Sequence, residues 1–311
     1  MTRPRLILHI GTHKTGTTAI QRALEDQRAE CLARGVFYPP TDREPWPELP
    51  KHCSVFAAAA RGNAAEAEAE RHWLLSQFRA SGAHTLLVSE EGLSEPMPHL
   101  PEFFAPMAAE FDIVVVCMLR RPDLFTESLY NQFVRETARR EGRPILMFSR
   151  AKGLRERLRY AEILRRWQSL PARVVALDFD ATIQDQALVA AFADAAGIAP
   201  LASVDDRANA SADVRLIQLL ARMNRQRLAY DLPRLMQAAA ALESEGRFPR
   251  CRHLLGRQER VLLLEDMAPE MTRLSRDFGV SFSGVLPAGE STSPTEDIDI
   301  PYTVELLARV A

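Results

Sequence analysis

A short glycine-bearing segment near the N-terminus constrains the fold of this chain more than any other feature. Residues 6–24 read LILHIGTHKTGTTAIQRAL, in which an apolar run is followed by a loop with two glycines and then by a helical apolar pattern. The apolar run predicts a buried strand at residues 5–10, and the spacing of apolar residues from Thr17 onward predicts a helix that ends near Gly35. The sequence therefore predicts a strand, a glycine loop and a helix in direct succession.

The residue types in this loop are those that bind an anion. Gly11 and Gly16 allow left-handed backbone, so that several N–H groups can point at one anion. Thr17 and Thr18 stand at the expected helix start, where N–H groups, hydroxyls and the helix dipole favour a phosphate or a similar oxyanion. The residues predicted to line the anion are Gly11, Thr12, His13, Lys14, Thr15, Gly16, Thr17 and Thr18.

The position of the lysine distinguishes this loop from that of a nucleoside-triphosphate P-loop. In the P-loop the lysine follows the last glycine, whereas Lys14 precedes Gly16. A metal-dependent P-loop kinase also needs an acidic Mg²⁺ ligand, and the best strand-end candidates, Asp178 and Asp180, come far downstream. The pattern therefore disfavours a kinase, which stays as an alternative, and no metal site is predicted.

The remainder of the chain alternates strands with helices over its first two thirds. Val114, Val115 and Val116 are β-branched and uninterrupted by charge, as in a central parallel strand. Alternation of this kind predicts an α/β fold with a central parallel sheet flanked by helices. We expect one domain over residues 1–311, with an α/β nucleotide-binding core at 1–200 and a helical part at 201–311. Strands are predicted at 85–89, within FDIVVVCMLRRP at 111–122, and at 172–179. Helices are predicted at 52–61, 63–80, 122–140, 152–169, 211–225, 231–244 and 256–278.

Ligands of parallel sheets bind at the carboxyl ends of the strands. Three polar segments follow predicted strands here, namely residues 11–18, Ser89–Glu91 and Arg120–Arg121. We therefore expect these segments to meet at one edge of the sheet and to form the functional site.

Charge and composition exclude several classes of protein. The net charge of −2 argues against nucleic-acid binding, which usually requires a basic excess. No apolar run reaches the length of about 18 residues that a membrane span needs, and no signal peptide precedes the first strand. Cysteines without metal-ligand spacing favour a reduced cytoplasmic setting. These cysteines are Cys31, Cys53, Cys117 and Cys251.

Two motifs together resemble the sulfotransferases that use 3′-phosphoadenosine-5′-phosphosulfate (PAPS), most closely the bacterial ones. HIGTHKTGTTAIQ is similar to the family's 5′-phosphosulfate loop, in which a lysine precedes a Gly-Thr-Thr run. VVVCMLRRPDLFTESLYNQF is similar to its 3′-phosphate motif, and Arg120 and Ser128 have the required spacing. Arg121 departs from the pattern, so either arginine could hold the phosphate, and the register favours Arg120. The resemblance covers residues 5–180.

The resemblance implies that the protein transfers a sulfo group from PAPS to a hydroxyl, without a metal. The acceptor would be a carbohydrate, a lipid or a small metabolite, and the product nucleotide 3′-phosphoadenosine-5′-phosphate. Lys14 would stabilise charge on the bridging oxygen. The family's general base is a glutamate or a histidine, so Glu90, Glu91 and His52 are all candidates. A non-catalytic nucleotide-binding protein of the same fold is the other alternative, and the sequence fixes neither the acceptor nor the oligomeric state.

Overall fold

The computed structural model describes residues 3–184, 187–202, 212–248, 250–282 and 299–310, which form two compact units. The first unit comprises Met1–Arg121, Arg159–Asp206 and Pro269–Ser283. The second comprises Pro122–Leu158, Arg207–Ala268 and Gly284–Ala311.

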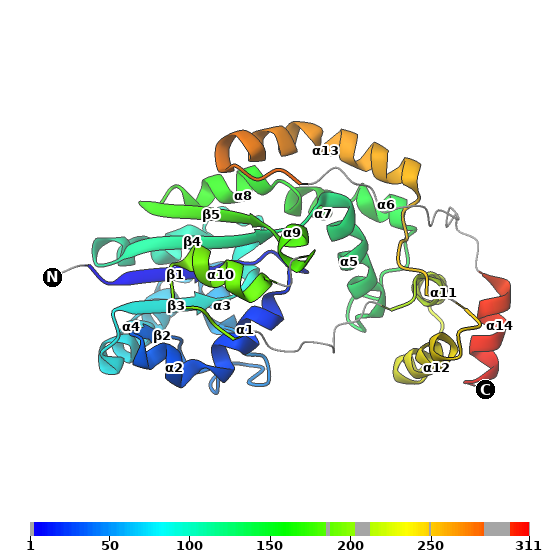
Figure 1. Ribbon diagram of the computed structural model, residues 1–311, viewed down its shortest axis with the longest axis horizontal. Helices are drawn as coiled ribbons and strands as arrows, with labels where there is room; N and C mark the ends of the chain where they lie inside the picture. The colour runs from blue at the N-terminus through cyan, green and yellow to red at the C-terminus, as the bar shows by residue number, and fades with distance from the viewer. Residues whose placement is uncertain (1–2, 185–186, 203–211, 249, 283–298, 311) are drawn as a thin grey trace. The chain divides into compact units, whose positions relative to one another are not determined.

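The first unit is built on a five-stranded parallel sheet with the order β2-β3-β1-β4-β5 (Figure 1). All four strands that the sequence predicts are present. A two-residue strand, β2, is added at one edge, and so short a strand leaves no periodicity in the sequence. The strands are β1 (Arg5–His9), β2 (Val36–Phe37), β3 (Thr85–Ser89), β4 (Asp112–Leu119) and β5 (Ala172–Asp178).

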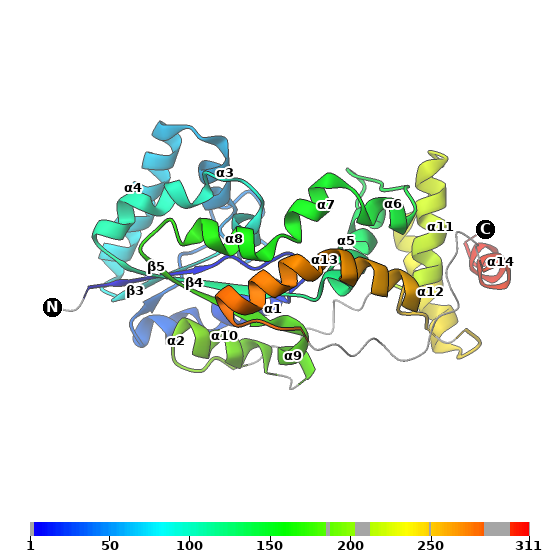
Figure 2. The ribbon, with the colours of Figure 1, turned by 90° about the horizontal axis from the view of Figure 1, so that it is seen from above.

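Helices cover both faces of this sheet, as predicted (Figure 2). On one face, α1 (Thr17–Asp26), α2 (Arg28–Ala33) and α10 (Leu188–Ala196) contribute to a core that includes Ile7, Ile20 and Phe192. The other face is covered by α3 (Cys53–Arg61), α4 (Ala64–Ser81) and α8 (Tyr160–Trp167). Three further elements belong to the unit: the 3₁₀ helices η1 (Glu91–Ser94) and η2 (Leu100–Ala109), and the helix α9 (Phe179–Gln184).

The strand register brings the three predicted segments to one edge. His9, at the end of β1, lies opposite Ser89 on β3 and Val116 on β4. The Glu90 N–H donates to the His9 carbonyl at 3.0 Å, and the Ile10 N–H donates to the Val116 carbonyl at 3.0 Å. The chain therefore leaves β1 and β3 side by side, next to the last residues of β4.

The second unit is helical. Its elements are α5 (Pro122–Arg135), α6 (Ile145–Ser149), α7 (Lys152–Arg157), α11 (Val214–Arg225), α12 (Leu232–Ser244) and α14 (Ile300–Ala308). The long helix α13 (Arg257–Phe278) is divided between the units at Pro269. The buried Arg260 guanidinium pairs with Asp123 at 2.6 Å and with Glu127 at 2.7 Å, which joins α13 to α5 within this unit.

The helices differ from the predicted ones in several places. The helix expected from Thr17 to near Gly35 is two helices, α1 and α2. The single helix expected at 152–169 is two helices, α7 and α8, and α5 ends at Arg135. The sequence did not predict α10, although its residues are almost all apolar. No helix of the described segments is long and apolar enough to cross a bilayer.

Candidate active site

The loop after β1 is held in a left-handed, tightly bonded conformation. Gly11, Lys14 and Gly16 have φ angles of 69°, 65° and 70°. The Thr12 N–H and hydroxyl both donate to the Met118 carbonyl, at 2.8 and 3.2 Å, and the Thr15 hydroxyl donates to the Thr12 carbonyl at 2.6 Å. The loop is thus fastened to β4 and to itself, which fixes the direction of its N–H groups.

The start of α1 presents donors that the protein itself does not use. Gly16 is the N-cap residue, and no side chain caps the helix. Within the described part of the chain, the N–H groups of Gly16, Thr17 and Thr18 and both threonine hydroxyls donate no hydrogen bond. Such donors, with the positive end of the helix dipole, suit a phosphate or sulfate group. The residues present therefore fit the anionic end of the donor that the sequence implies.

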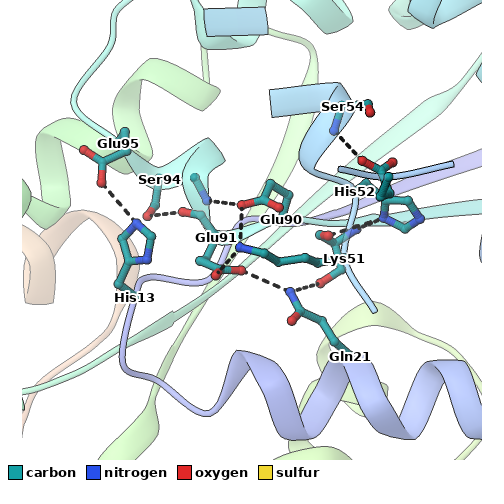
Figure 3. A network of polar contacts seen from close by, with 12 residues as sticks. His13, Gln21, Lys51, His52, Ser54, Glu90, Glu91, Ser94 and Glu95 are labelled. Atoms are coloured by element: carbon teal, nitrogen blue, oxygen red, sulfur yellow. Dashed lines mark hydrogen bonds and ion pairs between the residues drawn. The ribbon is translucent and has the colours of Figure 1, made fainter. Parts of the chain in front are cut away.

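A lysine and two glutamates form a largely buried cluster beside this loop (Figure 3). The Lys51 Nζ donates to Glu91 Oε1 at 2.8 Å and lies 3.5 Å from Glu90 Oε1. Glu91 Oε2 accepts a hydrogen bond from Gln21 Nε2 at 3.1 Å, and Glu90 Oε1 accepts the Gly92 N–H at 2.9 Å. Sequence reasoning identified both glutamates and missed Lys51.

The surroundings shift the acidities of the two carboxyl groups in opposite directions. Burial, and then the charge of Glu91, raise the pKa of Glu90 above its usual range. Burial also acts to raise the pKa of Glu91, but the charge and hydrogen bond of Lys51, with smaller contributions from His13 and the backbone, together outweigh burial and lower the pKa. The pKa of Lys51 is raised, because its two carboxylate partners outweigh the effect of burial. At neutral pH the cluster therefore keeps Glu91 ionised and Lys51 charged.

The surroundings of His52 are typical of a histidine with a structural role. It is completely buried, its Nδ1 accepts the Ser89 N–H at 3.0 Å, and its Nε2 lies 3.2 Å from the Pro39 carbonyl oxygen. Because Nδ1 accepts, Nε2 must carry the proton and donate to Pro39. Burial lowers the pKa of His52 to about 4, so that the ring is neutral. Both ring nitrogens are thus occupied by the backbone, which leaves neither for a substrate.

The two other histidines near the loop occupy different surroundings. His9 is completely buried, with Nδ1 2.8 Å from the Ser89 hydroxyl, and burial lowers its pKa to about 4. His13 lies on the loop itself, and its Nε2 is 3.0 Å from Glu95 Oε1.

Arg120 reaches the anion loop from the end of β4. Its Nη1 donates to the Lys14 carbonyl at 3.3 Å and its Nε donates to Asp180 Oδ1 at 3.3 Å. The guanidinium also lies over Phe179, 5.3 Å from the ring centroid. Ser128 belongs to α5 in the second unit and is partly buried. The pairing of Arg120 with Ser128 stays a prediction from the sequence.

Asp178 and Asp180, the downstream aspartates, both accept hydrogen bonds from other groups of the protein. Asp178, the last residue of β5, accepts the Asp180 N–H at 2.9 Å through Oδ1. Asp180 pairs with Arg120 and accepts the Arg121 N–H at 3.0 Å. In the described segments, no three histidine, cysteine or acidic residues are grouped as metal ligands would be.

Comparisons with known proteins give only distant likenesses. No protein-family model matches the sequence, and no curated protein matches it. A sulfotransferase from Alicyclobacillus acidocaldarius is 14% identical, with a TM-score of 0.47 over 91% of this chain and 98% of its own. A sulfotransferase domain from the curacin biosynthetic pathway is 14% identical, with a TM-score of 0.35 over 78% of this chain and 98% of its own. Likenesses this weak carry no argument about function, which must come from the residues of the site.

Proposed function

We propose that this protein is a PAPS-dependent sulfotransferase that acts on a hydroxyl of a carbohydrate, a lipid or a small metabolite. The observation that carries the proposal is the anion loop beside a buried carboxylate cluster, both within the first unit. The loop carries Lys14 ahead of the helix, and its unused donors at Gly16–Thr18 suit a phosphosulfate group. A donor site and a proton acceptor are the two parts that transfer to a hydroxyl requires.

On the donor side, PAPS supplies an activated sulfo group attached to a phosphate leaving group. The N–H groups of residues 16–18 and the hydroxyls of Thr17 and Thr18 bind the 5′-phosphate. Lys14 stabilises the negative charge that develops on the bridging oxygen as the sulfur–oxygen bond breaks. Arg120 binds the 3′-phosphate, a role that the sequence resemblance extends to Ser128.

On the acceptor side, a glutamate is the general base. A carboxylate of the Glu90–Glu91 pair accepts the hydroxyl proton while the hydroxyl oxygen bonds to sulfur. The burial of His52 and the backbone bonds at both its ring nitrogens favour the glutamates over this histidine.

The kinase alternative makes different demands on the same region. It needs a lysine on the helix after the last glycine and a carboxylate available for Mg²⁺. Thr17 occupies the position of that lysine, and Asp180 is engaged with Arg120. Both observations support sulfo transfer over phosphoryl transfer.

A thermal-shift comparison tests the proposed donor. With EDTA present, 3′-phosphoadenosine-5′-phosphate should raise the melting temperature, because a ligand at 100 times its Kd stabilises the folded state by about 2.7 kcal/mol. Adenosine 5′-phosphate, which lacks the group assigned to Arg120, should give a smaller rise. A shift with ATP and Mg²⁺ but none with 3′-phosphoadenosine-5′-phosphate would contradict the proposal. Mass spectrometry of a metabolite extract incubated with enzyme and PAPS then separates an enzyme from a non-catalytic binder, since only the enzyme adds sulfo groups.

A further inference from the structure

Lys51 is fixed in place by the residue that follows it. The His52 N–H donates to the Ser89 carbonyl at 3.0 Å, and the His52 ring accepts the Ser89 N–H at 3.0 Å. The Lys51 N–H donates to the Leu49 carbonyl at 2.8 Å. These bonds hold the backbone at residue 51 against the end of β3, so the side chain extends to the two glutamates that follow this strand (Figure 3).

The lysine is largely withdrawn from water together with its partners. The side chains of Lys51, Glu90 and Glu91 are 16%, 4% and 14% exposed. A charged group that is withdrawn from water is tolerated only when it is paired and hydrogen-bonded. The ammonium meets this condition at Glu91 Oε1, 2.8 Å away, and lies 3.5 Å from Glu90.

Besides Lys51, the two glutamates accept hydrogen bonds from different neighbours. Glu90 caps the 3₁₀ helix η1 through the Gly92 N–H. Glu91 reaches Gln21 on α1, and its Cβ lies against the anion loop, where a Cβ added to Gly11 would be 2.8 Å from it. Glu91 is therefore the carboxylate beside the loop, and Glu90 is the more deeply buried partner.

Among the described residues, Lys51 is the permanently charged cation that contacts Glu91. The neutral Gln21 approaches from α1, and His13 adds a positive charge only when it is protonated. Other charged or titratable groups of the described residues near Lys51 and the two glutamates include His9 on β1, Cys53 on α3, and Glu95 on the same segment as Glu91. Tyr38 and Glu44 also lie near this cluster.

We propose that Lys51 is a positioning residue that keeps Glu91 ionised and directs it toward the anion loop, which makes Glu91 the general base. This inference rests on the proposed function. Glu91 receives the hydroxyl proton in the transfer, and Lys51 keeps its own charge and touches no substrate. Each carboxylate oxygen of Glu91 can accept a second hydrogen bond, so the contacts with Lys51 and Gln21 leave room for that proton.

Carboxyl titration in the unliganded protein tests the inference without any transfer assay. Glutamate carboxyl carbons labelled with ¹³C are followed by NMR as the pH changes, and Glu91→Gln identifies the Glu91 signal. We expect Lys51→Met to raise the pKa of Glu91 by about one to three units, the range that an opposite charge within hydrogen-bond distance accounts for. Lys51→Arg should restore most of the shift. Lys152→Met is the matched control, because its side chain is 90% exposed on α7.

The wild-type titration alone can overturn the inference, should Lys51→Met not fold. Glu91 is expected to titrate below the usual glutamate range, and a value above that range would overturn the inference. A folded Lys51→Met protein whose Glu91 signal titrates as in the wild type would overturn it equally. A protein that shows the expected shift but transfers no sulfo group would contradict the proposed function and leave the coupling of Lys51 to Glu91 established.

Discussion

Lys14→Ala is expected to lower kcat by roughly 100- to 1,000-fold, the usual cost of removing one group that stabilises transition-state charge. The affinity for 3′-phosphoadenosine-5′-phosphate should change little, because the lysine acts mainly on charge that develops during transfer. The substitution adds no backbone strain of its own. Lysine already holds a φ of 65° at this position, and alanine carries the same Cβ.

Arg120→Ala provides the contrast for this prediction. It removes the guanidinium that borders the anion loop from β4, so the Kd of the nucleotide should rise while kcat at saturation is largely kept. Lys152→Ala controls for the loss of a positive charge, because the Lys152 side chain is exposed on α7. If Lys14→Ala and Arg120→Ala changed kcat and Kd in the same proportions, the division of roles between the two residues would be wrong.

Glu91→Gln is the second substitution with a large expected effect. It keeps the shape and the Gln21 and Lys51 neighbours but removes the proton acceptor, and we expect kcat to fall by roughly 100- to 10,000-fold. Glu90→Gln should cost far less, because a glutamine oxygen can still accept the Gly92 N–H that Glu90 binds.

The pH profile of kcat also distinguishes Glu91 from Glu90 as the general base. Because the charge and hydrogen bond of Lys51, with smaller contributions from His13 and the backbone, lower the pKa of Glu91 despite its burial, the wild-type enzyme should keep its base ionised down to a pH below the usual glutamate range. Its rate should persist to the same pH. Below that pH the base is protonated and kcat falls. The Glu91→Gln enzyme should lack this acid limb. A large loss in Glu90→Gln with full activity in Glu91→Gln would assign the base to the other carboxylate.

Local patterns were sufficient to predict the sheet and the anion loop. Unbroken apolar runs marked four of the five strands, and the glycine and threonine spacing marked the loop. The edge strand β2 has only two residues and left no pattern. The sequence of the helix α10 is almost uniformly apolar, so it shows no alternation of apolar and polar residues from which a helix could be predicted.

The site was only partly predictable because its contacts join distant segments. Lys51 contacts Glu90 and Glu91, which lie 39 and 40 positions further along the sequence. No pattern near residue 51 indicates those partners. His52 was a reasonable candidate base from its residue type alone. Its complete burial and its two backbone partners, which the sequence does not show, favour a structural role.

A crystal structure with 3′-phosphoadenosine-5′-phosphate, grown in EDTA, is the sharpest test of the proposed donor site. We expect the 5′-phosphate on the N–H groups of residues 16–18, with the Lys14 ammonium beside the oxygen that would carry the sulfo group. The 3′-phosphate should lie on Arg120. A nucleotide bound with its 5′-phosphate away from the loop, or a loop that stays empty at saturating nucleotide, would show that the loop does not bind the donor.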